Sequence, residues 1–154
     1  MKKKVYIETT VISDATALPS NDLKLVGRQI TTREWFAEAR DLYDLYVSAV
    51  VVREAQRGDA DAAARRMKGL EGIPVLPVVT EAVQLADTLI AKKAVPKEYR
   101  DDAMHIAIAA VYGLDYLVSW NFKHITNAHM IPKIKEVCLN EGYKCAEICT
   151  PTMV

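Results

Sequence analysis

The stretch 101-DDAMHIAIAAVYGLDYLVSWN-121 decides the fold class of this 154-residue chain. Residues 106–111 contain no polar side chain, and a helix that is apolar on every side is a buried helix. The segment that follows, DYLVSWN, has the pattern of a strand. A buried helix that leads directly into a strand is part of a βαβ unit, and it predicts a parallel sheet with helices packed against it.

Strand-like and helical patterns alternate along the rest of the chain, without a linker, a repeat or a low-complexity segment. We therefore expect an α/β fold, with a mainly parallel sheet covered by helices on both faces, in one domain over residues 1–154. The expected strands are 4–8, 46–48, 73–78, 115–121 and 145–149, and the expected helical segments are 22–43, 49–58, 59–70, 80–95, 95–113 and 127–143.

Several residues predict where helices begin and end. Thr31 and Glu34 have the spacing of a capping box, which predicts that a helix starts or restarts there. Thr80 is a plausible N-cap, and Pro96 closes the segment that Thr80 opens. Pro132 lies inside a helical pattern and predicts a kink.

The composition is that of a globular protein, with 51% hydrophobic and 26% charged residues. The 20 basic and 20 acidic residues cancel, so a nucleic-acid partner must be met by a local basic patch. No apolar run is long enough to span a bilayer, and we expect a cytosolic protein with reduced cysteines. Cys145 and Cys149 are too far apart along one strand to form a disulfide.

Polar residues follow the expected strands, at the edge of the sheet where parallel α/β folds bind their ligands. Glu8 follows the first strand, Glu54 lies in the helix after the second, Asp102 begins the buried helix, and Asn121 follows the strand at 115–121. Each carboxylate alone is better explained as a helix cap or a solvated side chain. Three carboxylates that converge would repel one another unless a proton or a cation intervened, and oxygen ligands suit Mg²⁺ or Mn²⁺.

The ordered set VYIETTVIS (5–13), SAVVVREAQRG (48–58) and DDAMHIAIAAVYGLDYLVSWNFKHI (101–125) resembles the PIN domain, specifically toxins of the VapC family. The resemblance implies a three-layer α/β/α sandwich and a metal-dependent endoribonuclease that uses Mg²⁺ or Mn²⁺. It also implies an RNA substrate, a homodimer and a small antitoxin whose tail enters the acidic cleft. The chemistry would be hydrolysis of an RNA phosphodiester.

By this resemblance, Glu8, Glu54, Asp102 and Asn121 match the four catalytic, metal-binding positions of the family. Glu8 stands where the family usually has Asp, and Asn121 replaces the usual fourth acid, so the cluster carries a charge of −3 instead of −4 and should bind a cation more weakly. Thr10 and Ser119 are supporting residues. They would orient ligands or contact phosphate, although bonding to nearby backbone explains them equally well.

Two other functions compete with this interpretation. The first is a non-catalytic module of the same fold, binding RNA or protein, in which the neutral Asn121 marks a degraded site. The second, a phosphoacceptor receiver domain, would need an acidic pair after the first strand, which YIETT does not supply. His105 is expected to be a hydrogen-bonded structural histidine. Lys123 and His124 either approach the phosphate of the substrate or belong to a surface loop.

Overall fold

A single parallel sheet forms the centre of the computed structural model, which describes residues 1–154. All four strand pairings are parallel, and the strand order is β3-β2-β1-β4-β5. The first strand, β1, is therefore central, and Val5 pairs with Leu45 on one side and with Tyr116 on the other. The strands are β1 (Lys4–Ile7), β2 (Asp44–Ser48), β3 (Val75–Leu76), β4 (Tyr116–Val118) and β5 (Glu147–Cys149).

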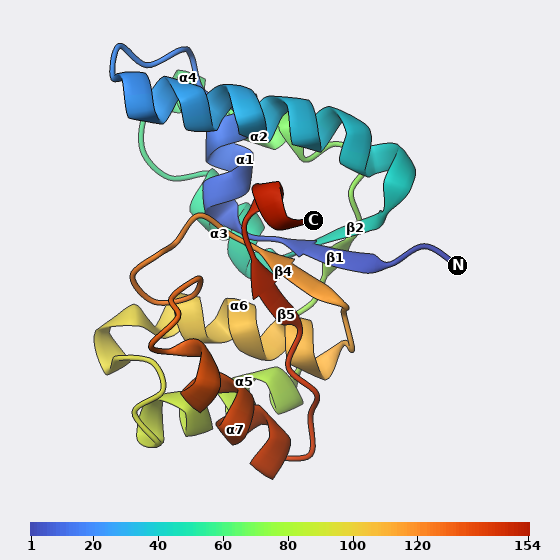
Figure 1. Ribbon diagram of the computed structural model, residues 1–154, viewed down its shortest axis with the longest axis vertical. Coiled ribbons are helices and arrows are strands. Elements are labelled where there is room, and N and C mark those ends of the chain that lie inside the picture. The colour runs from blue at the N-terminus through green and yellow to red at the C-terminus, as the bar shows by residue number, and fades with distance from the viewer.

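Helices cover both faces of this sheet, which confirms the expected three-layer α/β/α architecture. Figure 1 shows α1, α2 and α4 on one side and α5, α6 and α7 on the other. The helices are α1 (Thr9–Thr16), α2 (Leu23–Leu42), α3 (Ala49–Ala55), α4 (Ala60–Gly69), α5 (Thr80–Ala91), α6 (Arg100–Val111) and α7 (Ile131–Asn140), with short 3-10 helices η1 (Lys97–Tyr99) and η2 (Pro151–Met153).

Helix α6 lies in the core, as its apolar sequence predicts. Every residue from Ala103 to Ala110 is buried, including His105. Gly113 then adopts a φ of 68°, a conformation that favours glycine, and this allows the chain to turn tightly from α6 into β4. The three cysteines are buried and unpaired, as expected. No helix is both long enough and apolar enough to cross a membrane.

The strand ends position polar residues because two strands enter helices with almost no loop. The chain passes from β1 to α1 through Glu8, which is the N-cap of α1. The chain passes from β2 to α3 through Ser48, which ends the strand and is the N-cap of α3. Parallel strands end at the same edge of the sheet, so both caps and the residues that follow β4 lie near one another.

The structure corrects several expectations about helix boundaries. Thr31 starts no helix, because α2 runs without interruption from Leu23 and is capped by Asp22, whose side chain accepts a hydrogen bond from Leu25 N. Val79, and not Thr80, is the N-cap of α5, and it makes no side-chain capping bond.

Two further boundaries also differ from the expectation. Pro132 causes no kink, since it lies in the first turn of α7, where a missing N–H breaks no helical bond. The last strand begins at Glu147, so Cys145 precedes it. Helix α1, over residues 9–16, was not expected from the sequence.

Leu117→Ala should lower the free energy of unfolding by about 2–5 kcal/mol, because it opens a cavity beside β4, where Leu117 is 1% exposed. Leu139→Ala is the matched control. Leu139 is 72% exposed, so its truncation should change stability by less than about 0.5 kcal/mol. Urea unfolding of both variants measures the difference, and equal losses would contradict the placement of β4 in the core.

Candidate metal centre

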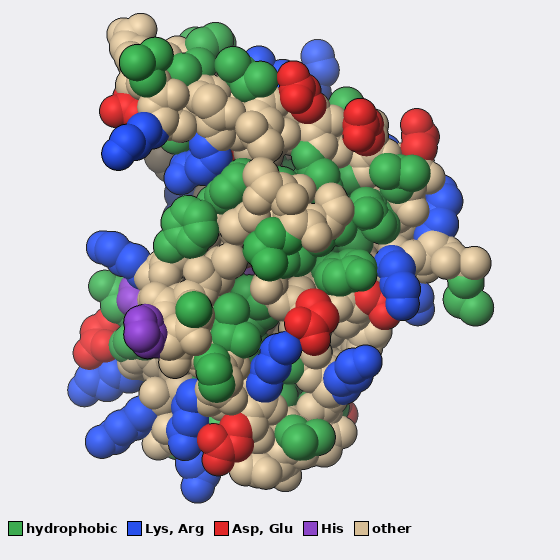
Figure 2. Space-filling model, in the orientation of Figure 1, with side chains coloured by type: hydrophobic (Ala, Val, Ile, Leu, Met, Phe, Trp, Pro, Cys, Tyr) green, Lys and Arg blue, Asp and Glu red, His purple; other side chains and the backbone are tan.

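A polar cleft of about 400 Å³ opens at the carboxyl ends of the strands. Figure 2 shows the molecule hollowed between the helices above the sheet and those below it, with Lys and Arg side chains on both rims. No hydrophobic residue lines the cleft. Its lining residues are Glu8, Thr9, Thr10, Ser13, Asp14, Arg28, Glu54, Arg57, Asp102 and Asn121.

Glu8 is the most buried carboxylate of the cleft, with 2% of its surface exposed. Its Oε1 accepts hydrogen bonds from Thr10 N at 3.1 Å, Thr10 Oγ1 at 2.5 Å and Ser119 Oγ at 2.7 Å. All three donors point at one oxygen, so Oε2 is left without a hydrogen-bond partner in the protein. The predicted supporting residues, Thr10 and Ser119, thus hold Glu8 in place.

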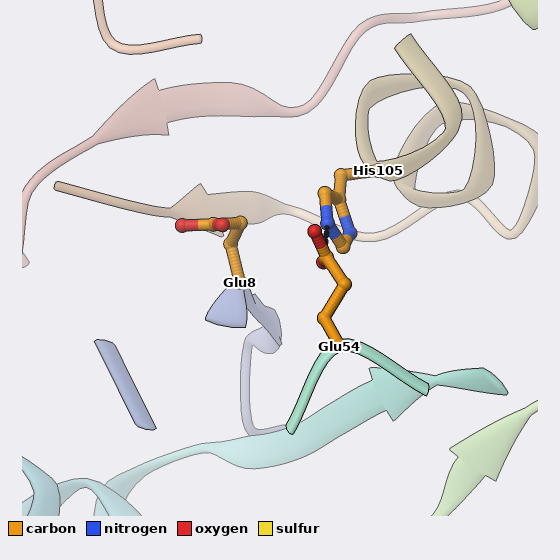
Figure 3. A group of neighbouring side chains, drawn as sticks. All are labelled: Glu8, Glu54 and His105. Atoms are coloured by element: carbon orange, nitrogen blue, oxygen red, sulfur yellow. Dashed lines mark hydrogen bonds and ion pairs between the residues drawn. The ribbon is translucent and has the colours of Figure 1, made fainter. Parts of the chain in front are cut away.

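Glu54 reaches the cleft from α3 and is held by two residues. Its Oε1 accepts a hydrogen bond from Thr9 Oγ1 at 2.7 Å and lies 2.6 Å from His105 Nε2. Figure 3 shows the Glu54 carboxylate against the His105 ring, with the Glu8 side chain beside them. The ligand atoms of Glu8, Glu54 and His105 all lie within 4.8 Å of one another.

His105 nevertheless serves Glu54 and not a cation. It is 0% exposed, its Nε2 is bonded to Glu54, and its Nδ1 lies 2.6 Å from the hydroxyl of Tyr6. A histidine with both ring nitrogens engaged has no lone pair to offer a metal. The expectation of a hydrogen-bonded structural histidine is confirmed.

Asp102 lines the cleft from the first turn of α6, whereas Asp101 is not among the lining residues. Asp102 Oδ2 lies 3.1 Å from His124 Nδ1, and the ring of His124 stacks on Tyr99 with 3.7 Å between ring centroids. Asp101 forms ion pairs with Arg53 at 2.5 Å and Arg57 at 3.7 Å. Asp102 is thus the member of this acidic pair that joins Glu8 and Glu54.

Asn121 lines the same cleft, but its side-chain oxygen already has a partner. Its Oδ1 accepts a hydrogen bond from His124 N at 3.1 Å, and its own N–H donates to Ser119 Oγ at 2.9 Å. The side chain therefore stabilises the turn that follows β4. His124 contacts Asp102, so it is placed at the site and not in a remote surface loop.

Burial is the main influence on the pKa values of the carboxyl groups in the cleft. Burial raises the pKa of Glu8, although His105, Thr10 and Ser119 act against the rise. Burial also raises the pKa of Asp102, with a small addition from the charge of Glu54, although His105, Asn121 and His124 act against the rise. Burial acts in the same direction on Glu54, but His105, Thr9 and Arg57 outweigh it and lower the pKa of Glu54.

His105 has a raised pKa, because the carboxylates of Glu54, Glu8 and Asp102 outweigh its burial, which acts the other way. Four titratable groups thus share one buried volume, and each depends on the charges of the others.

The donor set fits a hard divalent cation. Three carboxylates line one cleft, the Oε2 of Glu8 has no protein partner, and no thiol or free imidazole faces the cleft. Carboxylate oxygens with room for water suit Mg²⁺ or Mn²⁺. A cation there would also favour the ionised forms of Glu8 and Asp102, whose pKa burial raises.

Two basic residues, Arg28 and Arg57, line the cleft. Arg28 of α2 donates from Nε to Asp14 Oδ2 at 2.5 Å and from Nη2 to Asp14 Oδ1 at 3.1 Å, and its guanidinium lies 5.6 Å from the ring centroid of Trp120. Arg57 lines the opposite wall, after α3. Asp14 belongs to α1, the helix that the sequence analysis missed, so no pattern could have paired it with Arg28.

The fold is similar to that of a known toxin. No protein-family model matches the chain, and no curated protein matches it. Among solved structures, the crystal structure of VapC20 from Mycobacterium tuberculosis, described as a Sarcin-Ricin loop cleaving toxin, superimposes with a TM-score of 0.58 at 16% sequence identity. The match covers 78% of this chain and 92% of that one. The chain therefore has a VapC-like PIN fold, as the sequence resemblance implied.

Glu8→Gln should stabilise the protein at pH 7 in the presence of a chelator. Because the pKa of Glu8 is raised on folding, the folded chain holds this proton at pH values where the unfolded chain has released it, and stability falls as pH rises through that window, upward from about 4.5. Thermal unfolding from pH 4 to 8 should show a shallower fall for Glu8→Gln than for the wild type. The exposed Glu38→Gln is the control, and equal slopes for Glu8→Gln and the wild type would contradict the assignment.

Proposed function

We propose that this chain is a Mg²⁺- or Mn²⁺-dependent endoribonuclease that acts as the toxin of a toxin–antitoxin pair. One observation carries the proposal: Glu8, Glu54 and Asp102 converge in a polar cleft at the carboxyl ends of a VapC-like parallel sheet. Paired carboxylates at this edge are an arrangement that holds a cation against phosphate. VapC20, which has a similar fold, is described as a Sarcin-Ricin loop cleaving toxin.

Glu8 and Asp102 are proposed as the direct ligands of the cation, with Glu54 binding it or orienting water. Asn121 is proposed in an outer role, because its Oδ1 is bonded to His124 N. When bound, the cation would supply a more acidic water and would neutralise charge on the phosphate. The protein residues prepare this chemistry: Thr10 and Ser119 hold Oε1 of Glu8 and leave its Oε2 without a protein partner.

The walls of the cleft would receive the RNA backbone. Arg57 is exposed and lies beside the carboxylates, so its guanidinium is placed to contact a phosphate. Arg28 is held by Asp14 and lies over Trp120, which keeps its position fixed. A neutral chain can thus attract RNA locally while its centre is acidic.

The remaining parts of the proposal follow the VapC resemblance. A small antitoxin would block the cleft with a segment that carries a positive charge, since three carboxylates favour a guanidinium or an ammonium group where the cation would sit. We further propose that the chain forms one domain, acts in the cytoplasm and forms a homodimer.

The alternative is a non-catalytic module of the same fold that binds RNA or protein. The internal hydrogen bond of Asn121 favours it, because a neutral amide that is already bonded adds little to cation binding. The two functions differ in one result: the module would bind Mn²⁺ or RNA without cleaving RNA.

RNA cleavage with Mg²⁺ or Mn²⁺ tests the proposal. Glu8→Ala and Asp102→Ala should each reduce the cleavage rate by more than about 100-fold. Loss of a residue that only orients a metal ligand costs about 10- to 100-fold, and loss of the ligand itself should cost more. EDTA should abolish cleavage. Asp87→Ala is the control, because Asp87 pairs with Arg100 on the surface and does not line the cleft. Undiminished cleavage in both cleft variants would show that the site is wrong.

The salt dependence of RNA binding tests Arg57. Arg57→Ala should reduce the slope of log affinity against log salt concentration by about 0.7, the value for one lost phosphate contact on a single strand. Binding is measured by fluorescence anisotropy in an Asp102→Asn background, so that the RNA stays intact. Lys92→Ala, outside the cleft, should leave the slope unchanged. An unchanged slope for Arg57→Ala would remove Arg57 from the RNA path.

A further inference from the structure

A buried chain of hydrogen bonds leads from the sheet to Glu54. Ser48 Oγ, at the end of β2, lies 2.7 Å from the hydroxyl oxygen of Tyr6 in β1. The same hydroxyl lies 2.6 Å from His105 Nδ1, and His105 Nε2 lies 2.6 Å from Glu54 Oε1. Ser48, Tyr6 and His105 are each 0% exposed. None of these three side chains has a part in the chemistry proposed above.

The N-cap of α3 sets the direction of this chain. Ser48 Oγ accepts hydrogen bonds from Val50 N at 3.2 Å and from Val51 N at 3.4 Å, which occupies the two lone pairs of the hydroxyl. Its own proton is then donated to the oxygen of Tyr6. In the neutral form of His105, Tyr6 in turn donates to Nδ1, and the remaining ring nitrogen, Nε2, carries the proton that faces Glu54.

Every polar atom of the chain is satisfied in this arrangement. If Tyr6 instead donated to Ser48, the proton of Ser48 would have no acceptor in a fully buried place, which costs about 1–3 kcal/mol. The cap of one helix thus selects the ring nitrogen that donates from another helix, α6.

This hydrogen-bond chain restricts Glu54, a long side chain that would otherwise sample several rotamers. Its Oε1 receives the His105 Nε2 proton and the Thr9 hydroxyl, so this oxygen is occupied. The carboxylate plane is held from two sides, and Oε2 is the oxygen left for a ligand in the cleft. A ligand held by partners of this kind binds a cation more tightly, because less freedom is lost on binding.

We propose that Ser48, Tyr6 and His105 are positioning residues that orient Glu54 for the cation, acting as one connected chain. The part that concerns the cation rests on the proposed function, whereas the chain itself rests on the contacts alone. Tyr6 is the informative member, because it touches neither Glu54 nor the cleft lining.

Tyr6→Phe tests the proposal, since it removes one hydroxyl and keeps the buried ring. Calorimetric titration should show about 10-fold weaker Mn²⁺ affinity, the usual size of an outer-partner effect. Tyr112→Phe is the matched control: it also removes a hydroxyl that makes a 2.7 Å hydrogen bond, to Pro77 O, but far from the cleft. Its Mn²⁺ affinity should equal that of the wild type. An unchanged affinity in Tyr6→Phe would overturn the proposal.

A double-mutant cycle separates a connected chain from two independent structural effects. His105→Leu removes the donor to Glu54, and Tyr6→Phe added to it should cause no further loss of Mn²⁺ affinity. His105→Gln, which keeps an N–H donor near the position of Nε2, should recover part of the affinity. Additive losses in the double variant would overturn the chain. Should His105→Leu fail to fold, Tyr6→Phe and His105→Gln decide the question.

A measurement without metal keeps this proposal distinct from the proposed function. In the metal-free wild type, ¹⁵N NMR should show His105 Nδ1 as a hydrogen-bonded acceptor, and Tyr6→Phe should shift the Nδ1 resonance toward that of an unbonded nitrogen. If the wild type bound no Mn²⁺ while the Nδ1 resonance behaved as stated, the metal site would be wrong and the chain would stand. If Tyr6→Phe left the Nδ1 resonance unchanged, the chain would be wrong whatever the metal does.

Discussion

The three hydrogen bonds that converge on Oε1 of Glu8 are the constraint on which the rest of the site depends. They come from α1, through Thr10 N and Thr10 Oγ1, and from the end of β4, through Ser119 Oγ. A carboxylate that is 2% exposed needs such partners, because an unpartnered buried charge is strongly disfavoured. The same bonds join the start of α1 to the end of β4 and leave Oε2 without a protein partner.

Capping and metal binding are therefore not alternatives for Glu8. As the N-cap of α1, it satisfies the N–H of Thr10 with one oxygen, and its other oxygen remains for a ligand. Ser48 combines two tasks in a similar way, since it caps α3 and also donates toward Tyr6. In both cases a strand passes directly into a helix, so the residue that ends the strand also builds the site.

The sequence predicted the architecture well because its signals are local. The apolar run at 106–111 marked the buried helix, and the residues that follow each strand marked the edge where Glu8, Glu54 and Asp102 meet. Helix α1 escaped prediction because its cap is a Glu, whereas Ser, Thr, Asp and Asn are the usual signals.

Contacts between distant segments could not be predicted. Thr9 and Glu54 are 45 residues apart, and Tyr6 and His105 are 99 residues apart. Only the folded sheet brings them together, and the same is true of Asp14 and Arg28. Asn121 was correctly placed at the cleft, but its bond to His124 N depends on the turn after β4, which residue type alone does not specify.

Anomalous diffraction from crystals soaked in Mn²⁺ tests the central claim most directly. We expect an anomalous peak in the cleft within bonding distance of Glu8 Oε2 and a carboxylate oxygen of Asp102. Glu54 should bind the ion directly or through one water molecule. A cleft that stays empty at saturating Mn²⁺, or an ion bound only elsewhere on the surface, would contradict it.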